Sequence, residues 1–240
     1  MGCPFPLIVR RGKGAGILSS PEKVEALLET MKAFPEIRFS VKMRLGGQDA
    51  EEWKALVPLL NRSCVTQVTL HPRIGKQQYK GTVDREAFRA FYEACERPLV
   101  YNGDLLTVVD IREVLEAFPR LKGVMLGRGL LANPALACRE GELSENELKA
   151  RVAQMHRQMY LYYHRVIEGG EAQLLAKLKT CWEYLVAGAG QETAEGYLEE
   201  QSPGRVSAGS GRGIAGINHS SFFLKYSYPM RQNRHFLVSQ

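Results

Sequence analysis

The sequence predicts an α/β fold, namely the C-terminal part of a TIM (β/α)8 barrel with about four βα units, followed by an all-helical domain. Stretches with helical spacing of apolar residues alternate with short strand-like runs, which is typical of a parallel sheet. The strand-like runs end in polar residues at a nearly constant interval. After Pro134 the alternation stops, and two long stretches typical of helices follow.

The first helix is predicted from Ser20, Pro21 and Glu22, which supply a cap, a first-turn proline and a first-turn acid. Apolar residues with 3.6-residue spacing predict further helices over residues 51–61, 84–96 and 107–118. Between the helices, strands are predicted over residues 38–44, 66–73, 98–104 and 123–129. Helices of this length between short strands are typical of βα units.

The polar residues near the strand ends are Lys42, His71, Asn102 and Arg128. They follow one another at intervals of 29, 31 and 26 residues. In the first two strands polar and apolar residues alternate, so one face packs on helices while the other presents polar groups. A (β/α)8 barrel builds its active site at the carboxyl ends of its strands. The doubly wound dinucleotide-binding fold does so too, but the glycines of G-K-G-A-G at 12–16 match its fingerprint poorly.

Three segments are expected along the chain. A complete barrel takes about 250 residues, so we predict a partial barrel over 1–138, a helical domain over 139–200 and a glycine- and serine-rich basic tail, poorly ordered, over 201–240. The helices of the second segment are predicted over 144–167 and 171–187. The tail contains five basic residues and no acidic one, so it holds most of the net charge of +6. Net charge is therefore no argument that the rest of the chain binds nucleic acid.

Composition excludes several classes of protein. Hydrophobic residues make up 45% and charged residues 24%, which is typical of a soluble globular protein. No apolar run approaches the ~18 residues that span a bilayer, and no secretory signal is visible. We therefore expect a cytoplasmic protein that does not associate with a membrane. The five widely spaced cysteines, with no CxxC, predict neither a disulfide framework nor a metal site. No stable protein partner is implied.

Six motifs follow one another in the chain. They are G-C-P at 2–4, G-x-G-A-G at 12–16, V-K-M-R at 41–44, H-P-R-x-x-x-Q-x-Y-x-G at 71–81, Y-N-G-D at 101–104 and G-V-M-L-G-R-G at 123–129 with N-P at 133–134. In order and spacing they resemble the flavin-dependent tRNA-dihydrouridine synthases over about residues 1–185. Members of that family have three complete barrel strands, and a fourth that ends in N-x-G-C-P, before this point. We therefore expect an N-terminally incomplete member.

The resemblance implies FMN-dependent reduction of uridine to 5,6-dihydrouridine in tRNA, with NADPH reducing the flavin. Hydride reaches C6, and a positioned acid must then deliver a proton to C5. In the family the cysteine of G-C-P is this acid, which implies a catalytic role for Cys3. A thiol with a pKa of about 8.5 is mostly protonated near neutrality. The other cysteines are expected to be small buried side chains, namely Cys64, Cys95, Cys138 and Cys181.

The resemblance also implies which residues contact the ring of FMN. Lys42 would stabilise the anionic reduced ring near N1 and O2, and His71 would hydrogen-bond the edge of the isoalloxazine. Each would suit a structural role equally well if taken alone. Together, polar groups at several strand ends are costly to bury without a ligand.

The remaining FMN contacts are expected at the ribityl chain and the phosphate. Asn102, Gly103 and Asp104 would approach them through backbone and side chain. Gly127 and Arg128 would bind the phosphate, because glycine permits close approach and arginine offers a bidentate clamp.

tRNA is the partner that the resemblance implies, with the target base flipped out of its stack. The predicted RNA-binding residues are Arg10, Arg11, Lys13, Arg73, Lys76, Arg151, Arg157 and Arg165. Further basic residues near them are Lys80, Lys149, Lys177 and Lys179. Charge alone would suit a solvated helix face as well. Tyr160, Tyr162 and Tyr163 are expected to pack between helices.

Two other functions stay open. A flavin-dependent barrel could reduce a small pyrimidine-like substrate, but such an enzyme has no need of the basic helical segment. A non-catalytic RNA-binding remnant would keep the basic helices and bind no flavin, so flavin binding separates it from both enzymes.

Overall fold

The computed structural model describes residues 1–137, 143–189 and 235–238 and divides into two compact units. The first unit comprises Met1–Gly127 and Pro229–Gln240, and the second comprises Arg128–Tyr228. The predicted boundaries after residues 138 and 200 lie outside the described residues.

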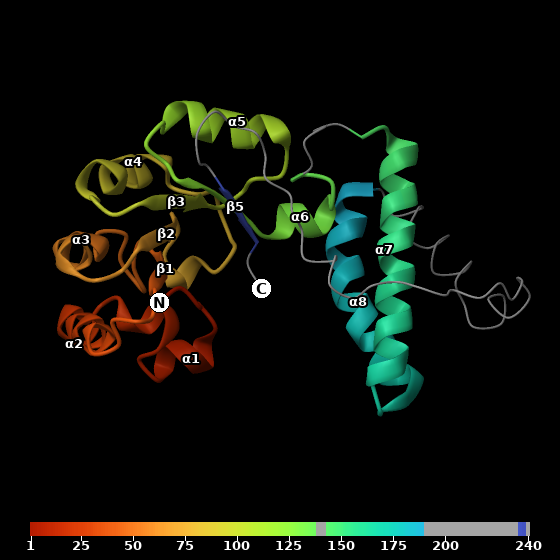
Figure 1. Cartoon of the computed structure of the whole chain (residues 1–240), viewed down its shortest axis with the longest axis horizontal. Coiled ribbons are helices and arrows are strands. Elements are labelled where there is room, and N and C mark those ends of the chain that lie inside the picture. Colours follow the sequence, from red (N-terminus) through yellow and green to blue (C-terminus); the bar gives the residue numbers. More distant parts are fainter. Residues whose placement is uncertain (138–142, 190–234, 239–240) are drawn as a thin grey trace, which may run out of the picture. The chain divides into compact units, whose positions relative to one another are not determined.

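The first unit is built on a parallel sheet whose strands follow the order β1-β2-β3-β4-β5 (Figure 1). The strands are β1 (Ser40–Arg44), β2 (Gln67–His71), β3 (Leu99–Asn102), β4 (Gly123–Leu126) and β5 (His235–Val238). The four predicted strands and the α/β fold are therefore confirmed. Strands adjacent in the chain are adjacent in the sheet from β1 to β4, as in a barrel. Arg44 pairs with His71 and Asn102 with Met125, so the carboxyl ends of the strands meet at one edge.

β5 was not expected from the sequence, which predicts a tail without regular structure after residue 200. Its four residues pair in parallel with β4, from Gly123 with His235 to Leu126 with Val238. A run of four residues is too short to show a strand period, so its partner could not be inferred from pattern alone. The remainder of the predicted tail lies outside the described residues.

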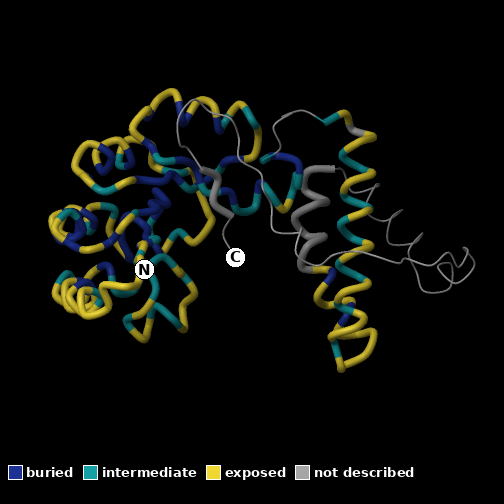
Figure 2. The backbone as a smooth tube through the Cα atoms, viewed as in Figure 1, coloured by how far each residue is buried: buried dark blue, intermediate teal, exposed yellow. Residues whose placement is uncertain are grey.

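Helices connect the strands and cover one side of the sheet (Figure 1). They are α2 (Pro21–Lys32), α3 (Trp53–Arg62), α4 (Arg85–Ala94) and α5 (Val108–Ala117). All four are predicted elements. Shorter elements that the sequence did not predict are α1 (Pro6–Arg10), η1 (Gly14–Ile17) and η2 (Gly75–Gln77). Buried residues follow the strands and recur along the helices (Figure 2). The core includes Leu28, Leu56, Phe88 and Val114 on the helices.

Side-chain caps fix the starts of α4 and α5, whereas the Ser20 side chain makes no capping hydrogen bond at the start of α2, contrary to the prediction of a cap there. The Asp84 carboxylate accepts a hydrogen bond of 2.8 Å from the amide of Ala87 at the start of α4. Thr107 and Asp110 cap each other's amides at the start of α5. Each cap satisfies amides that have no partner within the helix.

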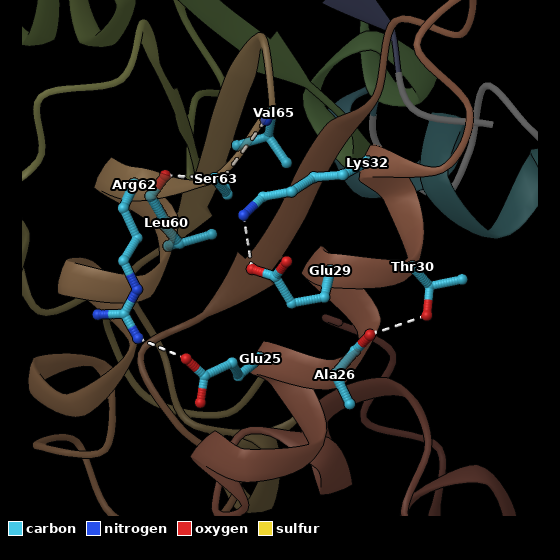
Figure 3. Close-up of polar contacts among 9 residues, drawn as sticks. All are labelled: Glu25, Ala26, Glu29, Thr30, Lys32, Leu60, Arg62, Ser63 and Val65. Carbon is cyan, nitrogen blue, oxygen red and sulfur yellow. Dashed lines mark hydrogen bonds and ion pairs between the residues drawn. The ribbon is translucent and has the colours of Figure 1, made fainter.

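Polar contacts also join the outer surfaces of α2 and α3 (Figure 3). Arg62 on α3 lies 2.6 Å from Glu25 on α2, and Lys32 lies 2.6 Å from Glu29 within α2. All four side chains are exposed, and such pairs contribute about 0–1 kcal/mol each. The apolar core therefore holds the two helices together.

The second unit contains α6 (Arg128–Ala132), α7 (Glu145–Val166) and α8 (Gly170–Ala189). The two long helices were predicted, and Ser144 begins the first of them by capping the amide of Glu147. Leu174 and Leu178 of α8 are buried against one side of α7, where they pack with Val152, Met155, Met159, Tyr160 and Tyr163. Within the described residues, no helix is long and apolar enough to cross a membrane.

Arg128 does not end a strand, contrary to the prediction of a strand over 123–129. β4 ends at Leu126, and Arg128 is the first residue of α6. The apolar residues continue past the end of the strand into R-G-L-L-A, so hydrophobicity alone gave no sign of the change from strand to helix.

Candidate active site

Charged side chains gather at the carboxyl ends of β1, β2 and β3 in the first unit. Lys42 and Arg44 lie on β1, His71 ends β2, and Asp104 follows β3. Arg73 lies two residues beyond His71. The parallel register brings these strand ends to one edge, as the sequence predicts for a barrel.

Arg73 and Asp104 form a bidentate ion pair between the ends of β2 and β3. The distances are 2.8 Å from Nη1 to Oδ1 and 2.6 Å from Nη2 to Oδ2. Nη2 also donates to the carbonyl of Gly81 at 2.6 Å. The Arg73 side chain is only 2% exposed. This burial is incompatible with the predicted contact between Arg73 and RNA phosphates, and we assign the residue to the interior.

The turn after β3 needs the glycine of Y-N-G-D. Gly103 has a φ of +142°, and a Cβ there would lie 2.8 Å from Cγ1 of Val83 and 3.1 Å from Cδ2 of His71. Asp104 follows with a φ of +45°. The backbone thus folds closely over the His71 ring and directs the Asp104 carboxylate to Arg73. The sequence had predicted that Gly103 and Asp104 contact FMN.

His71 is a neutral hydrogen-bond acceptor toward Arg73. Its Nε2 lies 3.2 Å from Nη1 of Arg73, which can only donate, so the ring proton is assigned to Nδ1. Burial lowers the pKa of His71 from 6.5 to about 3, and the charges of Arg44, Lys42 and Arg73 add to this shift. The Asp104 carboxylate opposes it. At neutral pH His71 therefore presents an Nδ1–H donor and carries no charge.

The depressed pKa of His71 predicts acid destabilisation. Below pH 6.5 the unfolded chain binds a proton at His71 that the folded chain does not bind until about pH 3, so stability falls as pH falls. Between pH 7 and pH 5 we expect this residue to lower the free energy of unfolding by about 2 kcal/mol. Urea unfolding of the wild type and His71→Asn at both pH values measures it. The hypothesis is contradicted if the free energy of unfolding of His71→Asn falls as much between pH 7 and pH 5 as that of the wild type.

Lys42 lies half-buried on β1, beside Arg44. Burial lowers the pKa of Lys42, and the neighbouring guanidinium of Arg44 lowers it further. Among the residues that the structure describes, no hydrogen bond or ion pair reaches the Lys42 ammonium. Within the described part of the chain, the edge of the sheet thus holds the cationic side chains of Lys42, Arg44 and Arg73 against the carboxylate of Asp104. Such an arrangement favours an anionic ligand.

The other predicted FMN contacts lie farther along the sheet or beyond it. Asn102 ends β3, and its side-chain amide donates to the carbonyl of Met125 at 2.8 Å, which leaves the amide oxygen as its remaining side-chain acceptor. Gly127 directly follows β4 in the first unit, whereas Arg128 belongs to the second. The phosphate contacts of Gly127 and Arg128 therefore stay predictions.

Cys3 is an exposed free thiol in a loop near the N-terminus. Its carbonyl accepts a hydrogen bond of 2.8 Å from the amide of Ala15. Gly14 has a φ of +58°, and a Cβ there would lie 2.5 Å from this carbonyl. The glycines of G-x-G-A-G thus allow the two loops to approach each other.

The remaining cysteines only partly follow the prediction of small buried side chains. Cys95 is buried, as predicted, and burial raises its pKa. Cys64 is exposed, so the prediction of a buried side chain is wrong there. It follows Ser63 beyond the end of α3, where the chain turns outward. The side chains at 138 and 181 lie outside the described residues.

Most predicted RNA-binding residues lie on the surface of their own unit. Those exposed in the first unit are Arg10, Arg11, Lys13 and Lys76, with Lys80. Those exposed on α7 are Arg151, Arg157 and Arg165. Tyr160 and Tyr163 pack against α8 as expected, but Tyr162 is 55% exposed, so the packing prediction is wrong for it.

Arg44 belongs to this site, although no role was predicted for it from the sequence. Its side chain is 1% exposed and lies at the carboxyl end of β1. The alternation in V-K-M-R places it on the same side as Lys42, a signal that could have identified it.

In the described part of the chain, no group of three or more histidine, cysteine or acidic side chains could hold a metal ion.

Comparisons with known proteins point to one family. The model of the dihydrouridine synthase family matches residues 1–200. A tRNA-dihydrouridine(16) synthase of Cupriavidus necator is 28% identical over 75% of this chain and 59% of its own length. A tRNA-dihydrouridine(20a/20b) synthase of Schizosaccharomyces pombe, whose name specifies NAD(P)+, is 32% identical over 56% of this chain and 41% of its own. A probable tRNA-dihydrouridine synthase of Rhizobium leguminosarum is 31% identical over 56% and 42%.

The chain spans between about a fifth and three fifths of the length of the curated relatives that it matches. The family match nevertheless covers most of the chain and includes every motif that the sequence singled out. The chain therefore belongs to the dihydrouridine synthase family.

Proposed function

We propose that the protein carrying this chain reduces uridine to 5,6-dihydrouridine in tRNA, with FMN as cofactor and NADPH as reductant. The observation that carries the proposal is the cluster of cationic side chains at the carboxyl edge of the sheet, together with the exposed thiol of Cys3. The names of the relatives support the reaction and its tRNA substrate.

The polar groups at the sheet edge suit an anionic, hydrogen-bonding cofactor such as FMN. Lys42 offers an ammonium group without a protein partner among the described residues, and His71 offers its Nδ1–H as a donor. Asn102 offers its amide oxygen as an acceptor. His71 is buried and the other two residues are half-buried, which strengthens each of these interactions because the local dielectric constant is lower than that of water.

FMN, when bound and reduced, would supply the hydride that adds to C6 of uracil. The chain's own contribution is then acid catalysis and orientation. The Cys3 thiol breaks its S–H bond and delivers the proton to C5, so that uracil is reduced and flavin oxidised. The resulting thiolate regains a proton from solvent.

Exposed basic residues would bind the phosphates of the RNA, because phosphate contacts position a nucleic acid without reading its sequence. In the first unit these are Arg10, Arg11, Lys13 and Lys76, and on α7 they are Arg151, Arg157 and Arg165. Unlike Arg73, none of them is buried.

FMN binding by the protein that carries this chain tests the proposal directly. We expect FMN to bind and its fluorescence to be quenched on binding. Lys42→Met should weaken the affinity for FMN at least about tenfold, because a partly desolvated charged contact is lost. Lys76→Met removes an exposed lysine and serves as the matched control, with an unchanged affinity. Equal affinities of wild type and Lys42→Met would refute the role of Lys42, and absence of FMN binding would refute the cofactor.

The reaction itself is tested with the protein that carries this chain, unmodified tRNA, FMN and NADPH. Mass spectrometry of digested tRNA should show uridine that has gained two hydrogens. A flavin-loaded protein that leaves tRNA unchanged but reduces free uracil or a related small pyrimidine would overturn the proposal.

A further inference from the structure

Arg44 connects two loops that lie on either side of the candidate active site. We infer that Arg44 is a positioning residue: it clamps the peptide group between Gly2 and Cys3 against the loop after β2 and thereby fixes the place of the Cys3 thiol. The inference rests on the proposed function for the meaning of Cys3, but the clamp can be tested without catalysis.

Arg44 donates hydrogen bonds to three backbone carbonyls and also interacts with the side chain of Tyr79. Its Nε donates to Gly2 at 3.2 Å, and its Nη1 donates to Ile74 at 3.0 Å and to Gln78 at 2.6 Å. Backbone carbonyls carry no formal charge, so these acceptors do not neutralise the guanidinium. Burial accordingly lowers the pKa of Arg44. Among the described residues no carboxylate forms an ion pair with Arg44, and burying such a charge destabilises the fold, so an apolar side chain would serve a purely structural role at lower cost.

The Gly2 carbonyl belongs to the same peptide group as the Cys3 amide. Its bond to Arg44 therefore fixes the plane from which Cys3 departs. The next carbonyl, that of Cys3 itself, accepts from the Ala15 amide at 2.8 Å. The backbone on both sides of the thiol is thus held, and Arg44 is the side chain that holds the first of the two peptide groups.

The other end of the clamp lies in the loop that carries Tyr79. Gln78 has a φ of +53°, which a residue other than glycine seldom adopts, and its carbonyl accepts the shortest of the Arg44 bonds. The Arg44 guanidinium lies 5.4 Å from the centre of the Tyr79 ring, and this ring lies 6.3 Å from that of His71. Arg44 thus holds two segments in one arrangement, namely the loop that contains Cys3 and the loop after β2 that carries Tyr79.

Alkylation of cysteine tests the clamp on the chain as it is. We compare the rate at which iodoacetamide modifies Cys3 with the rate at Cys64, an exposed thiol outside this site that serves as an internal control. In Arg44→Lys and Arg44→Met we expect Cys3 to react at least about threefold faster relative to Cys64, because its exposed loop is no longer held in one conformation. Gln78→Gly relieves the backbone strain in the other loop and should leave the ratio unchanged.

Kinetics of the protein that carries this chain provide the second measurement. Arg44→Lys should lower kcat at least about tenfold and change the KM for tRNA little, because a displaced thiol slows proton transfer rather than binding. An unchanged ratio of alkylation rates in Arg44→Lys would overturn the clamp, even if Arg44→Met fails to fold. If Cys3→Ala proves fully active while the ratio changes as expected, the proposed role of Cys3 fails and the clamp stands.

Discussion

Cys3→Ala is expected to lower the rate of dihydrouridine formation by about 10²–10⁴-fold, the usual contribution of a positioned acid. Oxidation of NADPH by bound FMN should continue, since it requires no proton donor at C5 of uracil. The measurement is the dihydrouridine content of tRNA after incubation with the protein that carries this chain, beside the loss of NADPH absorbance.

Cys64→Ala provides the matched control for this experiment. Its thiol is exposed like that of Cys3 but lies beyond the end of α3, away from the sheet edge that carries Lys42. We expect its rate to equal that of the wild type. Normal dihydrouridine formation by Cys3→Ala would show that another group protonates C5.

Asp104→Asn is expected to lower the free energy of unfolding by about 3 kcal/mol. The substitution leaves the guanidinium of Arg73, which is 2% exposed, without the carboxylate that neutralises it. Removing one partner of a buried ion pair typically costs about 3–5 kcal/mol, and the lower end applies because Asp104 is 32% exposed. Urea unfolding at pH 7 measures the change.

Two comparisons sharpen this measurement. Glu25→Gln breaks the exposed pair with Arg62 and should change stability by less than about 1 kcal/mol. The double variant Arg73→Met/Asp104→Asn removes both charges, so it should be more stable than the sum of its single changes implies. Asp104→Asn with the stability of the wild type would mean that water, rather than Asp104, compensates the charge of Arg73.

The sheet and its long helices could be predicted because each has its own local signal. The polar residues near the ends of β1, β2 and β3 recur at the length of a βα unit, and α7 and α8 have long uninterrupted helical patterns. β5 has no such signal, because its place depends on pairing with β4, which is distant in the chain. Periodicity describes an element but not its neighbour in space.

The site could be predicted where a residue's position on a strand decides its environment. Alternation along β1 placed Lys42 on the polar side, and the structure finds it there, half-buried. Arg73 follows β2 in a segment with further basic residues, and on charge alone it was predicted to bind RNA. Its burial depends on Asp104, which lies 31 positions away. No local pattern reveals such a pair, and the carbonyl contacts of Arg44 are equally non-local.

The pairing of β4 with β5 has a consequence for the order of folding. Each strand from β1 to β4 finds its partner across one βα unit, whereas Gly123 pairs with His235, which is 112 positions further on. Closing so long a loop is slow compared with the local closures that build the rest of the sheet. The outer edge of β4 therefore stays unpaired early in folding, and on a ribosome it stays unpaired until β5 has been made. During that interval its free amides and carbonyls are open to association with another chain.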